Sequence, residues 1–534
     1  MAAASEPAES DYIVIGAGSA GSAVAKRLTE IPGATVTLIE AGPPDRNPWL
    51  HVPIGYARTM FHPVLSWNYR TAPEPELDGR AIPWPRGRVL GGSSAINGLL
   101  YVRGQAEDYD HWRQLGCIGW SYADVLPFFR RAEDNERGAC AHHGAGGPLA
   151  VSDLRDRNPI AAAFIAAALE LGFPENPDFN GPTQEGAGWF QVTARRGWRC
   201  SAYTAYLRPR PPNLRLLTEA LALRLTFTGR RCSGVLVRQG GREFALSARR
   251  EVVLCGGAVN SPQLLMLSGI GDATELAALG IPVLHHAPEV GRNLQDHLQA
   301  RVVFRATRPV TVNDMMASLP RKLAAGLHFA LRRRGPLTFS AGQAGLFARV
   351  LPGSATPDVQ YHFIPFSSDR PGEPLHPFSG FTISVCQLRP ESRGRIALKS
   401  PKPEDPPLIE ARYLSAETDR RCMVAGLRLI RRLAATRALS RWIAAEYAPG
   451  PQAEGDEALL AFCRATAGTI YHPAGSCRMG EDPGAVVDSR LRVRGVEGLR
   501  VADASIMPTV VSGNTNAACI MIGEKCAAMM REAA

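Results

Sequence analysis

The feature that most constrains the fold is a glycine-rich turn within residues 11–42. Four apolar residues, 12–15, precede the turn and predict a buried strand. The turn itself reads GAGSAG at 16–21, and the pattern predicts a helix from 19 to about 31. A second strand is expected at 35–39. A strand, a G-x-G-x-x-G turn, a helix and a second strand together predict a βαβ unit that binds a dinucleotide.

Single residues of this unit refine the prediction. Gly16 permits the tight turn, Gly18 lets a pyrophosphate approach the backbone, and Gly21 lets the helix pack closely against the strand. The start of the helix offers unpaired N–H groups and a positive dipole end to phosphates. Glu40 lies about 20 residues further on, where an acid accepts from ribose hydroxyls and disfavours the 2′-phosphate of NADP. The turn alone does not separate NAD from FAD.

Length and composition exclude several classes of protein. A chain of 534 residues predicts two or more large domains, and 45% hydrophobic with 21% charged residues is a globular composition. There is no apolar run long enough to span a membrane, and residues 1–12 lack the apolar core of a secretory signal. The net charge of +10 comes from scattered arginines and favours a solvated basic surface over nucleic-acid binding. Eleven cysteines at irregular spacings predict reduced thiols in a cytoplasmic chain.

A second glycine-rich stretch lies at residues 86–104. Gly91, Gly92, Ser93 and Ser94 precede a helical pattern and predict another anion-binding turn. Two turns that favour phosphate in one chain suit a long dinucleotide held in an extended form. The alternative is a glycine turn without a ligand.

Four further blocks carry a family resemblance. The chain resembles the glucose–methanol–choline (GMC) flavoprotein oxidoreductases in the N-terminal turn and in residues 91–104, 257–271, 472–480 and 503–524. Within that family it most resembles the bacterial alcohol and choline dehydrogenases. The resemblance implies an α/β fold (α+β overall), with a Rossmann-like FAD-binding domain and a substrate domain built on an antiparallel sheet flanked by helices. We expect the discontinuous FAD-binding domain at 10–155, 212–302 and 467–534, and the substrate domain at 156–211 and 303–466.

The resemblance also implies a reaction. A primary alcohol is expected to be oxidised to the aldehyde by hydride transfer to the flavin, with electrons passed to a quinone or an artificial acceptor. An imidazole suits removal of the hydroxyl proton, and the family motif places His472 as that base. Asn514 is favoured as the second polar group at the substrate oxygen, while Asn516 competes with it and would otherwise lie close to the flavin.

Further residues are implied as cofactor contacts by the fingerprint and the family motifs. Some family members attach FAD through a histidine in the second glycine block, and Ile96 stands at the corresponding place, which predicts non-covalent FAD. The expected cofactor-binding residues are Gly16, Gly18, Ser19, Ala20, Gly21, Glu40, Ala41, Trp67, Arg88, Gly91, Gly92, Ser93, Asn97, Gly98, Leu99, Ala222, Asp503, Ala504, Thr515 and Asn516.

The same residues leave other functions open. An alcohol oxidase would pass its electrons to O₂, and a nicotinamide dehydrogenase would bind NAD in place of FAD. Hydroxynitrile lyases and a light-driven decarboxylase also resemble the family. The decarboxylase needs a cysteine near Leu388 and lacks the catalytic histidine, whereas this chain keeps His472. A pure nucleotide-binding module leaves His472 and Asn514 without a role.

Local patterns complete the expectations. Strands are predicted at 302–306, 358–364, 382–387 and 394–398.

Helices are predicted within 118–139, at 158–172 and from Ser261-Pro262, and a loop is predicted at 176–189. Cys140, His142 and His143 favour a surface loop over a metal site.

Two features are left with open roles. Residues 320–334 form a basic amphipathic helix that either lies on an anionic membrane or borders the active-site entrance. His297, which follows Asp296, is expected to be structural.

Overall fold

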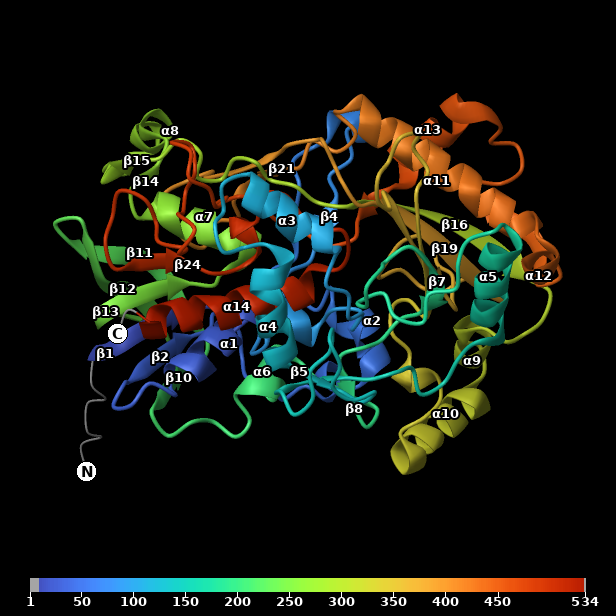
Figure 1. The fold of residues 1–534 in the computed structure, drawn as a ribbon, viewed down its shortest axis with the longest axis horizontal. Helices are drawn as coiled ribbons and strands as arrows, with labels where there is room; N and C mark the ends of the chain where they lie inside the picture. Colours follow the sequence, from blue (N-terminus) through green and yellow to red (C-terminus); the bar gives the residue numbers. More distant parts are fainter. Residues whose placement is uncertain (1–8, 533–534) are drawn as a thin grey trace.

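The computed structural model describes residues 9–532, which form two sheets side by side with helices around them (Figure 1). The first eight residues lie outside the described part, so the expected lack of a secretory signal there stays a prediction. The predicted domain boundaries also stay predictions.

The first sheet is built around the N-terminal strand. Its order is β10-β2-β1-β13-β12-β11, with β24 paired to β13, and the strands from β10 to β13 and β24 run parallel. β1 is buried along nearly its whole length because it lies in the middle of the sheet. The strands are β1 (Glu9–Ile15), β2 (Val36–Ile39), β10 (Leu214–Leu217), β11 (Ala220–Thr228), β12 (Arg231–Gln239), β13 (Arg242–Leu254) and β24 (Leu499–Val501).

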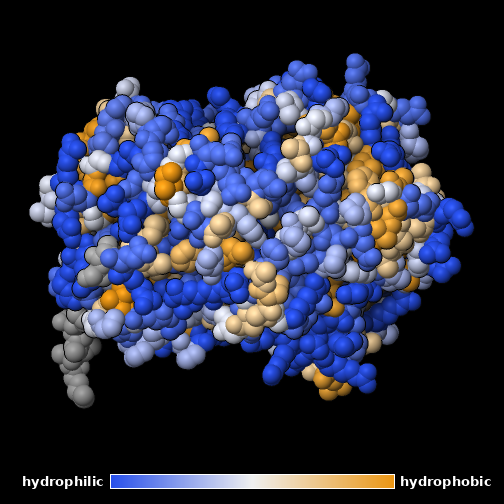
Figure 2. Space-filling view, viewed as in Figure 1, coloured by the Kyte–Doolittle hydropathy of each residue, from blue (hydrophilic) through white to orange (hydrophobic). Residues whose placement is uncertain are grey.

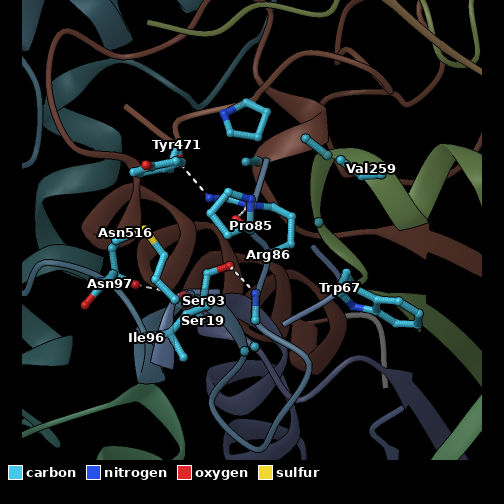
Figure 3. A pocket seen from close by; sticks show the side chains of 18 of the residues that line it. Ser19, Trp67, Pro85, Arg86, Ser93, Ile96, Asn97, Val259, Tyr471 and Asn516 are labelled. Atoms are coloured by element: carbon cyan, nitrogen blue, oxygen red, sulfur yellow. Dashed lines mark hydrogen bonds between the residues drawn. The ribbon is translucent and has the colours of Figure 1, made fainter. Parts of the chain in front are cut away.

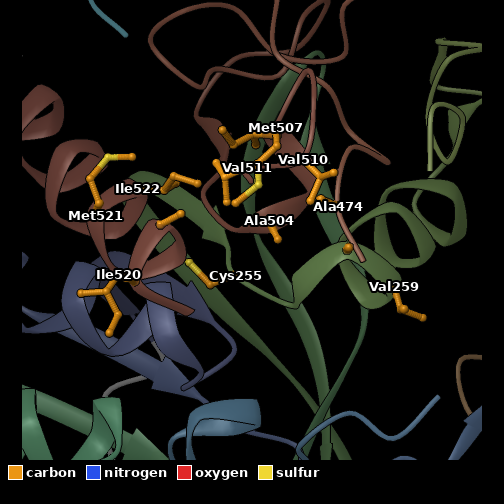
Figure 4. Packing of buried hydrophobic residues seen from close by; sticks show 14 of the residues in the cluster. Cys255, Val259, Ala474, Ala504, Met507, Val510, Val511, Ile520, Met521 and Ile522 are labelled. Carbon is orange, nitrogen blue, oxygen red and sulfur yellow. The ribbon is translucent and has the colours of Figure 1, made fainter. Parts of the chain in front are cut away.

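Helices from both ends of the chain cover this sheet. α1 (Ser19–Leu28) packs on α14 (Thr515–Glu532), drawn in blue and red in Figure 1. A Cβ at Gly523 would lie 2.5 Å from the Ala20 carbonyl oxygen, so this glycine allows the close approach. Glu524 is fully buried and pairs with Arg27 at 2.9 Å. Apolar residues of α14 and of the segments after β13 and β24 pack in one cluster (Figure 4).

The second sheet is antiparallel, as predicted. Its order is β22-β16-β19-β18-β17-β7, with β23 paired to β16. α11 packs on β19 and α5 packs on β17 and β18, while other residues of the sheet face a cavity. The strands are β7 (Gly186–Trp189), β16 (Leu298–Ala306), β17 (Ala344–Ala348), β18 (Val359–Ile364), β19 (Gly380–Gln387), β22 (Ile443–Ala448) and β23 (Gly468–Thr469).

The remaining helices surround the two sheets or connect them. The described longer ones are α3 (Ala106–Gln114), α4 (Tyr122–Ala132), α5 (Pro159–Glu170), α7 (Gly257–Leu267), α10 (Leu319–Arg332), α11 (Glu417–Ala435) and α13 (Gly455–Thr466). The shorter ones are α2 (Tyr56–Thr59), α6 (Ala202–Tyr206), α8 (Ala273–Ala278), α9 (Val312–Met316) and α12 (Arg437–Ser440). Short two-stranded sheets, such as β20 (Arg395–Ala397) with β21 (Leu408–Glu410), complete the fold.

Several local predictions are wrong for identifiable reasons. Helix α4 ends at Ala132, and the next residues form β5 (Glu133–Asn135) instead of continuing to 139, because they pair with β6 (Leu149–Val151). The loop predicted at 176–189 instead ends in a strand, β7, because these residues pair with β17 in the second sheet. The strand predicted at 394–398 lies outside the large sheet, since β20 pairs with β21.

The start of α7 is also misplaced. The helix begins at Gly257 and contains Pro262 in its interior, where a proline removes one helical hydrogen bond. Ala258 supplies the carbonyl oxygen that would have received that bond, and it accepts instead from the Ser476 hydroxyl at 2.6 Å. A contact from far along the chain therefore makes the proline acceptable here.

All eleven cysteines are free thiols. Among residues 9–532, there is no helix with the length and apolar character needed to cross a membrane.

Candidate active site

One large cavity, with a volume of about 410 Å³, is lined by both sheets. The glycine turns line one end of it, and residues of β16 and β18 line the other. Figure 3 shows Ser19, Ser93, Asn97, Arg86 and Trp67 among the residues that line it. A volume of this size is within the range of ligand-binding cavities.

Backbone atoms build the nucleotide end of the cavity. Gly16 has a φ of +104°, and Gly18 precedes α1 without any side chain capping the helix, so the first N–H groups of the helix are free to bind phosphate. The second glycine turn meets the first one here. A Cβ at Gly92, whose φ is +52°, would lie 2.7 Å from the Cα atom of Gly18. The two turns predicted to favour phosphate therefore form one cradle.

Glu40 closes the fingerprint turn from the end of β2. Its carboxylate accepts from the backbone N–H of Ala17 at 3.0 Å and of Gly42 at 2.9 Å. Burial is the main cause that raises the pKa of Glu40, to about 7. The side chain lines the cavity, where the sequence predicts a ribose contact.

Most of the predicted site residues line this cavity. Three do not: Gly21, Arg88 and Gly91. Gly21 lies against β1, where a Cβ would be 1.9 Å from the Gly16 carbonyl oxygen. The Arg88 guanidinium stacks 4.9 Å from the ring centre of Trp67, and the Gly91 N–H donates to the Ala17 carbonyl at 2.9 Å. These residues support the layer that faces the cavity.

Asp503 lines the cavity, but its carboxylate is already bound by protein groups. It accepts from the Gly257 N–H at 2.8 Å, the Ser261 hydroxyl at 2.6 Å and the Ser505 N–H at 2.8 Å. Its side chain thus fixes the start of α7 beside the cavity.

The two predicted catalytic residues meet at the other end. His472 Nε2 lies 3.1 Å from Asn514 Nδ2, and both residues line the cavity. Asn514 Oδ1 accepts from Gln360 Nε2 at 3.3 Å, which orients the amide. Asn516, the competing residue, accepts from the Ser19 hydroxyl at 2.7 Å and so faces the nucleotide end.

A third residue fixes the tautomer of His472. His297 is fully buried, its Nε2 lies 3.1 Å from the Leu388 carbonyl oxygen, and its Nδ1 lies 3.0 Å from His472 Nδ1. A carbonyl oxygen only accepts, so neutral His297 carries its proton on Nε2 and has a lone pair on Nδ1. His472 must then carry its own proton on Nδ1. The lone pair of His472 is left on Nε2, beside Asn514.

The surroundings keep this pair of imidazoles neutral. Burial, followed by the nearby His297, His362 and Arg86, holds the pKa of His472 well below its ordinary value. Burial also lowers the pKa of His297 to about 4.

Hydrogen bonds also fix the backbone of His472 and of the residue before it. Asp296 accepts from the His472 N–H at 2.8 Å, and burial raises the pKa of Asp296 to about 6. The preceding residue, Tyr471, has a φ of +71°, and its carbonyl oxygen accepts from Arg86 at 2.9 Å. A residue other than glycine in this region of φ stores strain, which the surrounding contacts must hold.

Sequence reasoning missed the roles of His297, Gln360 and Arg199. His297 was expected to be structural, yet it contacts the predicted base directly. The Arg199 guanidinium is buried and donates to the side chain and carbonyl oxygens of Asn97 at 2.6 and 2.7 Å, which fixes a cavity residue from behind. Nothing in the spacing of these residues signals the contacts, because each joins segments that are distant in sequence.

The stretch around Cys140 differs from the expected surface loop at one residue. His143 is buried and lies between Glu133 at 3.0 Å and Asp178 at 2.8 Å. Side-chain hydrogen bonds to these acids outweigh burial and raise the pKa of His143 to about 9. It therefore belongs to a buried ionic network that includes Arg103.

The geometry fits FAD. The paired glycine turns, the free helix start and Glu40 suit an adenosine diphosphate moiety, and the cavity continues from there to a neutral imidazole base. A Rossmann-type cofactor site joined to a base in one cavity is typical of an oxidoreductase with a dinucleotide cofactor.

Comparisons with known proteins agree. The N-terminal GMC oxidoreductase pattern matches residues 10–299, and the C-terminal one matches residues 390–523. The chain is 43% identical to an alcohol dehydrogenase [acceptor] of Pseudomonas putida, over 97% of this chain and 95% of that protein. It is 44% identical to the mitochondrial choline dehydrogenase of Homo sapiens, over 98% of this chain and 90% of that protein.

Solved structures show the same relationship. Pyridoxine 4-oxidase from Mesorbium loti superposes with a TM-score of 0.88 at 32% identity, covering 97% of this chain and 98% of that one. A formate oxidase gives a TM-score of 0.93 at 27% identity, covering 99% of both chains. The protein belongs to the GMC oxidoreductase family, and FAD is its cofactor.

Proposed function

We propose that the protein oxidises a primary alcohol to the aldehyde and passes the electrons to a quinone. The observation that carries this proposal is the lone pair of neutral His472 Nε2, presented to the cavity beside the Asn514 amide. The P. putida relative is named an alcohol dehydrogenase, which supports the same substrate class.

Three residues of this chain have separate roles in the reaction of the alcohol. In this structure Asn514 Nδ2 donates to His472 Nε2, and the alcohol replaces that bond: its hydroxyl lies beside both groups, so that His472 Nε2 accepts the hydroxyl proton while Asn514 Nδ2 donates to the oxygen. His297 receives the Nδ1–H of His472 and stabilises the imidazolium that forms, since its own Nε2–H stays on the Leu388 carbonyl. The bound FAD supplies the acceptor for the hydride that leaves the alcohol carbon.

FAD is held without a covalent bond in this proposal. Ile96 lines the cavity where a histidine would be needed for attachment. Denaturation should therefore release all of the flavin into the supernatant, and flavin that stays with the precipitated chain would contradict the proposal.

Anaerobic flavin bleaching tests the reaction. Alcohols of several lengths are mixed with the holoenzyme without oxygen, and loss of the visible flavin absorbance is expected. A lyase or a light-driven decarboxylase leaves the flavin oxidised in the dark, so the lack of bleaching by every alcohol would reject the oxidation.

Reoxidation then identifies the acceptor. The reduced enzyme is mixed with air or with a soluble quinone analogue, and fast recovery of absorbance with the quinone alone is expected. Recovery with air at a comparable rate, together with hydrogen peroxide, would assign the protein as an oxidase instead.

The surface of α10 supports contact with a membrane, where quinones reside. Its Leu319, Leu323, Leu327 and Leu331 are 68%, 66%, 61% and 75% exposed. Residues four apart lie on one face of a helix, so these leucines form an apolar stripe. Apolar side chains are visible at the lower edge of Figure 2, where Figure 1 draws α10.

The charge around the leucine stripe complements an anionic lipid surface. Residues 319–334 contain five basic side chains and no acid: Arg321, Lys322, Arg332, Arg333 and Arg334. We propose that α10 lies on the cytoplasmic face of an anionic membrane, because an apolar face and a basic flank together give stable interfacial binding.

Vesicle sedimentation tests this contact. The holoenzyme should co-sediment with phosphatidylglycerol vesicles and not with phosphatidylcholine vesicles. Leu323→Ser with Leu327→Ser should release it, whereas Leu169→Ser, at a 40% exposed leucine of α5, should not. If the holoenzyme does not bind vesicles but forms dimers that the double serine variant cannot form, the stripe contacts a second copy of the chain instead.

A further inference from the structure

The substrate end of the cavity contains polar groups without partners. Among the described residues, no partner is found for Arg301 Nη1, for either ring nitrogen of His362, or for Gln360 Oε1, although all these atoms are buried. Arg301 and His362 line the cavity. Buried polar groups in native proteins are usually hydrogen-bonded, so buried polar atoms without a partner beside a cavity indicate a polar ligand.

Arg301 is the charged member of this group. It forms no hydrogen bond or ion pair with any residue in the described part of the chain, and burial lowers its pKa, yet a guanidinium stays protonated. The carboxylates that influence it, Asp369 and Glu373, are exposed on the loop after β18. Asp369 pairs instead with His376, at 3.0 Å. Arg301 is half-buried, but its Nη1 atom is fully buried, and a buried charged donor without a partner is costly, which favours an anion from outside the chain.

The neighbouring wall supplies one opposite charge, Glu373, which lines the cavity but is exposed to solvent, where its attraction for Arg301 is screened. Gln299, two residues earlier on β16, is neutral and donates to the Ser384 hydroxyl at 2.8 Å. His362 is kept neutral, since burial lowers its pKa to about 3. Arg301 is therefore the cation on this wall that has no direct partner and is available to a ligand.

The position of Arg301 sets the shape of that ligand. His297, which contacts the base His472, and Arg301 are four residues apart where β16 begins, about 13 Å along a strand. They lie on the same side of the strand because side chains alternate. A molecule that reaches both the base and the guanidinium therefore carries a hydroxyl and, at a separate position, an anionic group.

We propose that the substrate is an alcohol with a carboxylate at its far end, bound by Arg301. The planar guanidinium matches a carboxylate with two parallel hydrogen bonds, and neutral His362 can donate a third. The inference rests on the proposed alcohol oxidation and adds the substrate class to it. It also implies that choline, a cationic alcohol, is a poor substrate, despite the 44% identity to a choline dehydrogenase.

A matched set of alcohols tests the substrate class in the unaltered holoenzyme. A hydroxyalkanoate, a diol and an aminoalcohol of equal chain length are compared by anaerobic flavin bleaching. We expect kcat/KM for the hydroxyalkanoate to exceed that of the diol by about 10- to 100-fold, as for a charge-assisted hydrogen bond. The aminoalcohol should be the poorest. Equal values for all three would overturn the role of Arg301, while no bleaching by any would instead reject the alcohol oxidation.

Variants locate the effect. Arg301→Gln should remove the preference for the carboxylate and leave the rate with the diol within a few-fold, and Arg301→Lys should restore part of the preference. Arg305→Gln, at an exposed arginine on the same strand, is the control and should keep the preference. Equal losses with hydroxyalkanoate and diol in Arg301→Gln would assign the residue to the flavin or to the fold, and would overturn the proposal.

A binding measurement avoids dependence on turnover. An alkanoate without a hydroxyl group should perturb the flavin absorbance of the wild-type holoenzyme at saturable concentrations, and Arg301→Gln should weaken that binding by about 10- to 100-fold. An alkanoate that binds both proteins equally would contradict the assignment.

Discussion

The two ends of the cavity are built from different parts of the polypeptide. At the nucleotide end, the turns at Gly18 and Gly92 and the start of α1 offer backbone N–H groups to the ligand. At the substrate end, imidazole, amide and guanidinium side chains from separate segments converge on the space. Backbone atoms are the same in every sequence, so the nucleotide end suits an invariant cofactor. Side chains can be exchanged singly, so the substrate end can change its specificity while the cofactor end keeps its form.

The sharpest test of this contrast removes the base. His472→Ala should lower the rate constant for flavin reduction about 100- to 10,000-fold, the range for a general base, while FAD stays bound. Stopped-flow reduction and the bound-flavin spectrum measure the two effects. Loss of the flavin together with the activity would show that the two ends are not separable.

His472 also determines how the rate of the wild-type enzyme depends on pH on the acid side of the profile. His472 must be neutral to accept a proton, and its pKa lies well below 6.5. The rate should therefore stay level as the pH falls to 6.5 and decrease only when the pH passes through the lowered pKa. A rate that already declines between pH 8 and 7 would contradict this assignment.

His297→Phe keeps a ring of similar size but removes the acceptor for the Nδ1–H of His472. The base can then adopt the other tautomer, and flavin reduction should slow by about 100-fold, by analogy with the loss of an orienting partner in other catalytic sites. His297→Asn, which can still accept, should be slowed less. A purely structural role for His297 would instead lower the melting temperature equally in both variants with unchanged kinetics.

At the nucleotide end, changes to the backbone should lower FAD affinity more than changes to side chains. Gly92→Ala places a Cβ against Gly18 at a φ of +52°, and the strain of about 1–3 kcal/mol should weaken FAD binding by about 5- to 150-fold. The dissociation constant for FAD, measured by fluorescence after flavin removal, gives the result. Gly33→Ala, also at a positive φ and in open space but not among the residues that line the cavity, is the control for strain alone.

The smallest effect is expected for a side chain at the same end. Ser19→Ala removes a hydroxyl that donates to Asn516, and FAD affinity should change by less than about 10-fold, as for one neutral hydrogen bond. A larger loss, seen in the same fluorescence titration, would show that the nucleotide end also relies on side chains.

The contrast also explains what the sequence could predict. Gly16 and Gly18 were identified because a turn that approaches a ligand requires glycine at fixed spacing, and Gly92 because adjacent glycines before a helical pattern predict an anion-binding turn. His472 and Asn514 were identified only through the family resemblance, and the structure brings them together as expected. Arg301 and His297 have no local signal, since their roles depend on how β16 packs beside segments far away in the chain.

Local structure shows the same division. The periodic helix α5 was predicted almost to the residue, because its pattern is set by neighbours in sequence. The start of α7 was misplaced, because the bond from Ser476 to Ala258 changes what a proline permits. Contacts between distant segments decide the cases in which local rules fail.

The pairing of β24 with β13 and the packing of α14 on α1 have a consequence for biosynthesis. Both late elements leave the ribosome after the whole antiparallel sheet, tens of seconds after β1 at typical rates of translation. Until then, α1 lacks the helix that packs on it, and β13 lacks its neighbour β24. Because Asp503, Asn514 and Asn516 also line the cavity, the complete binding site forms only after nearly the whole chain has been synthesised.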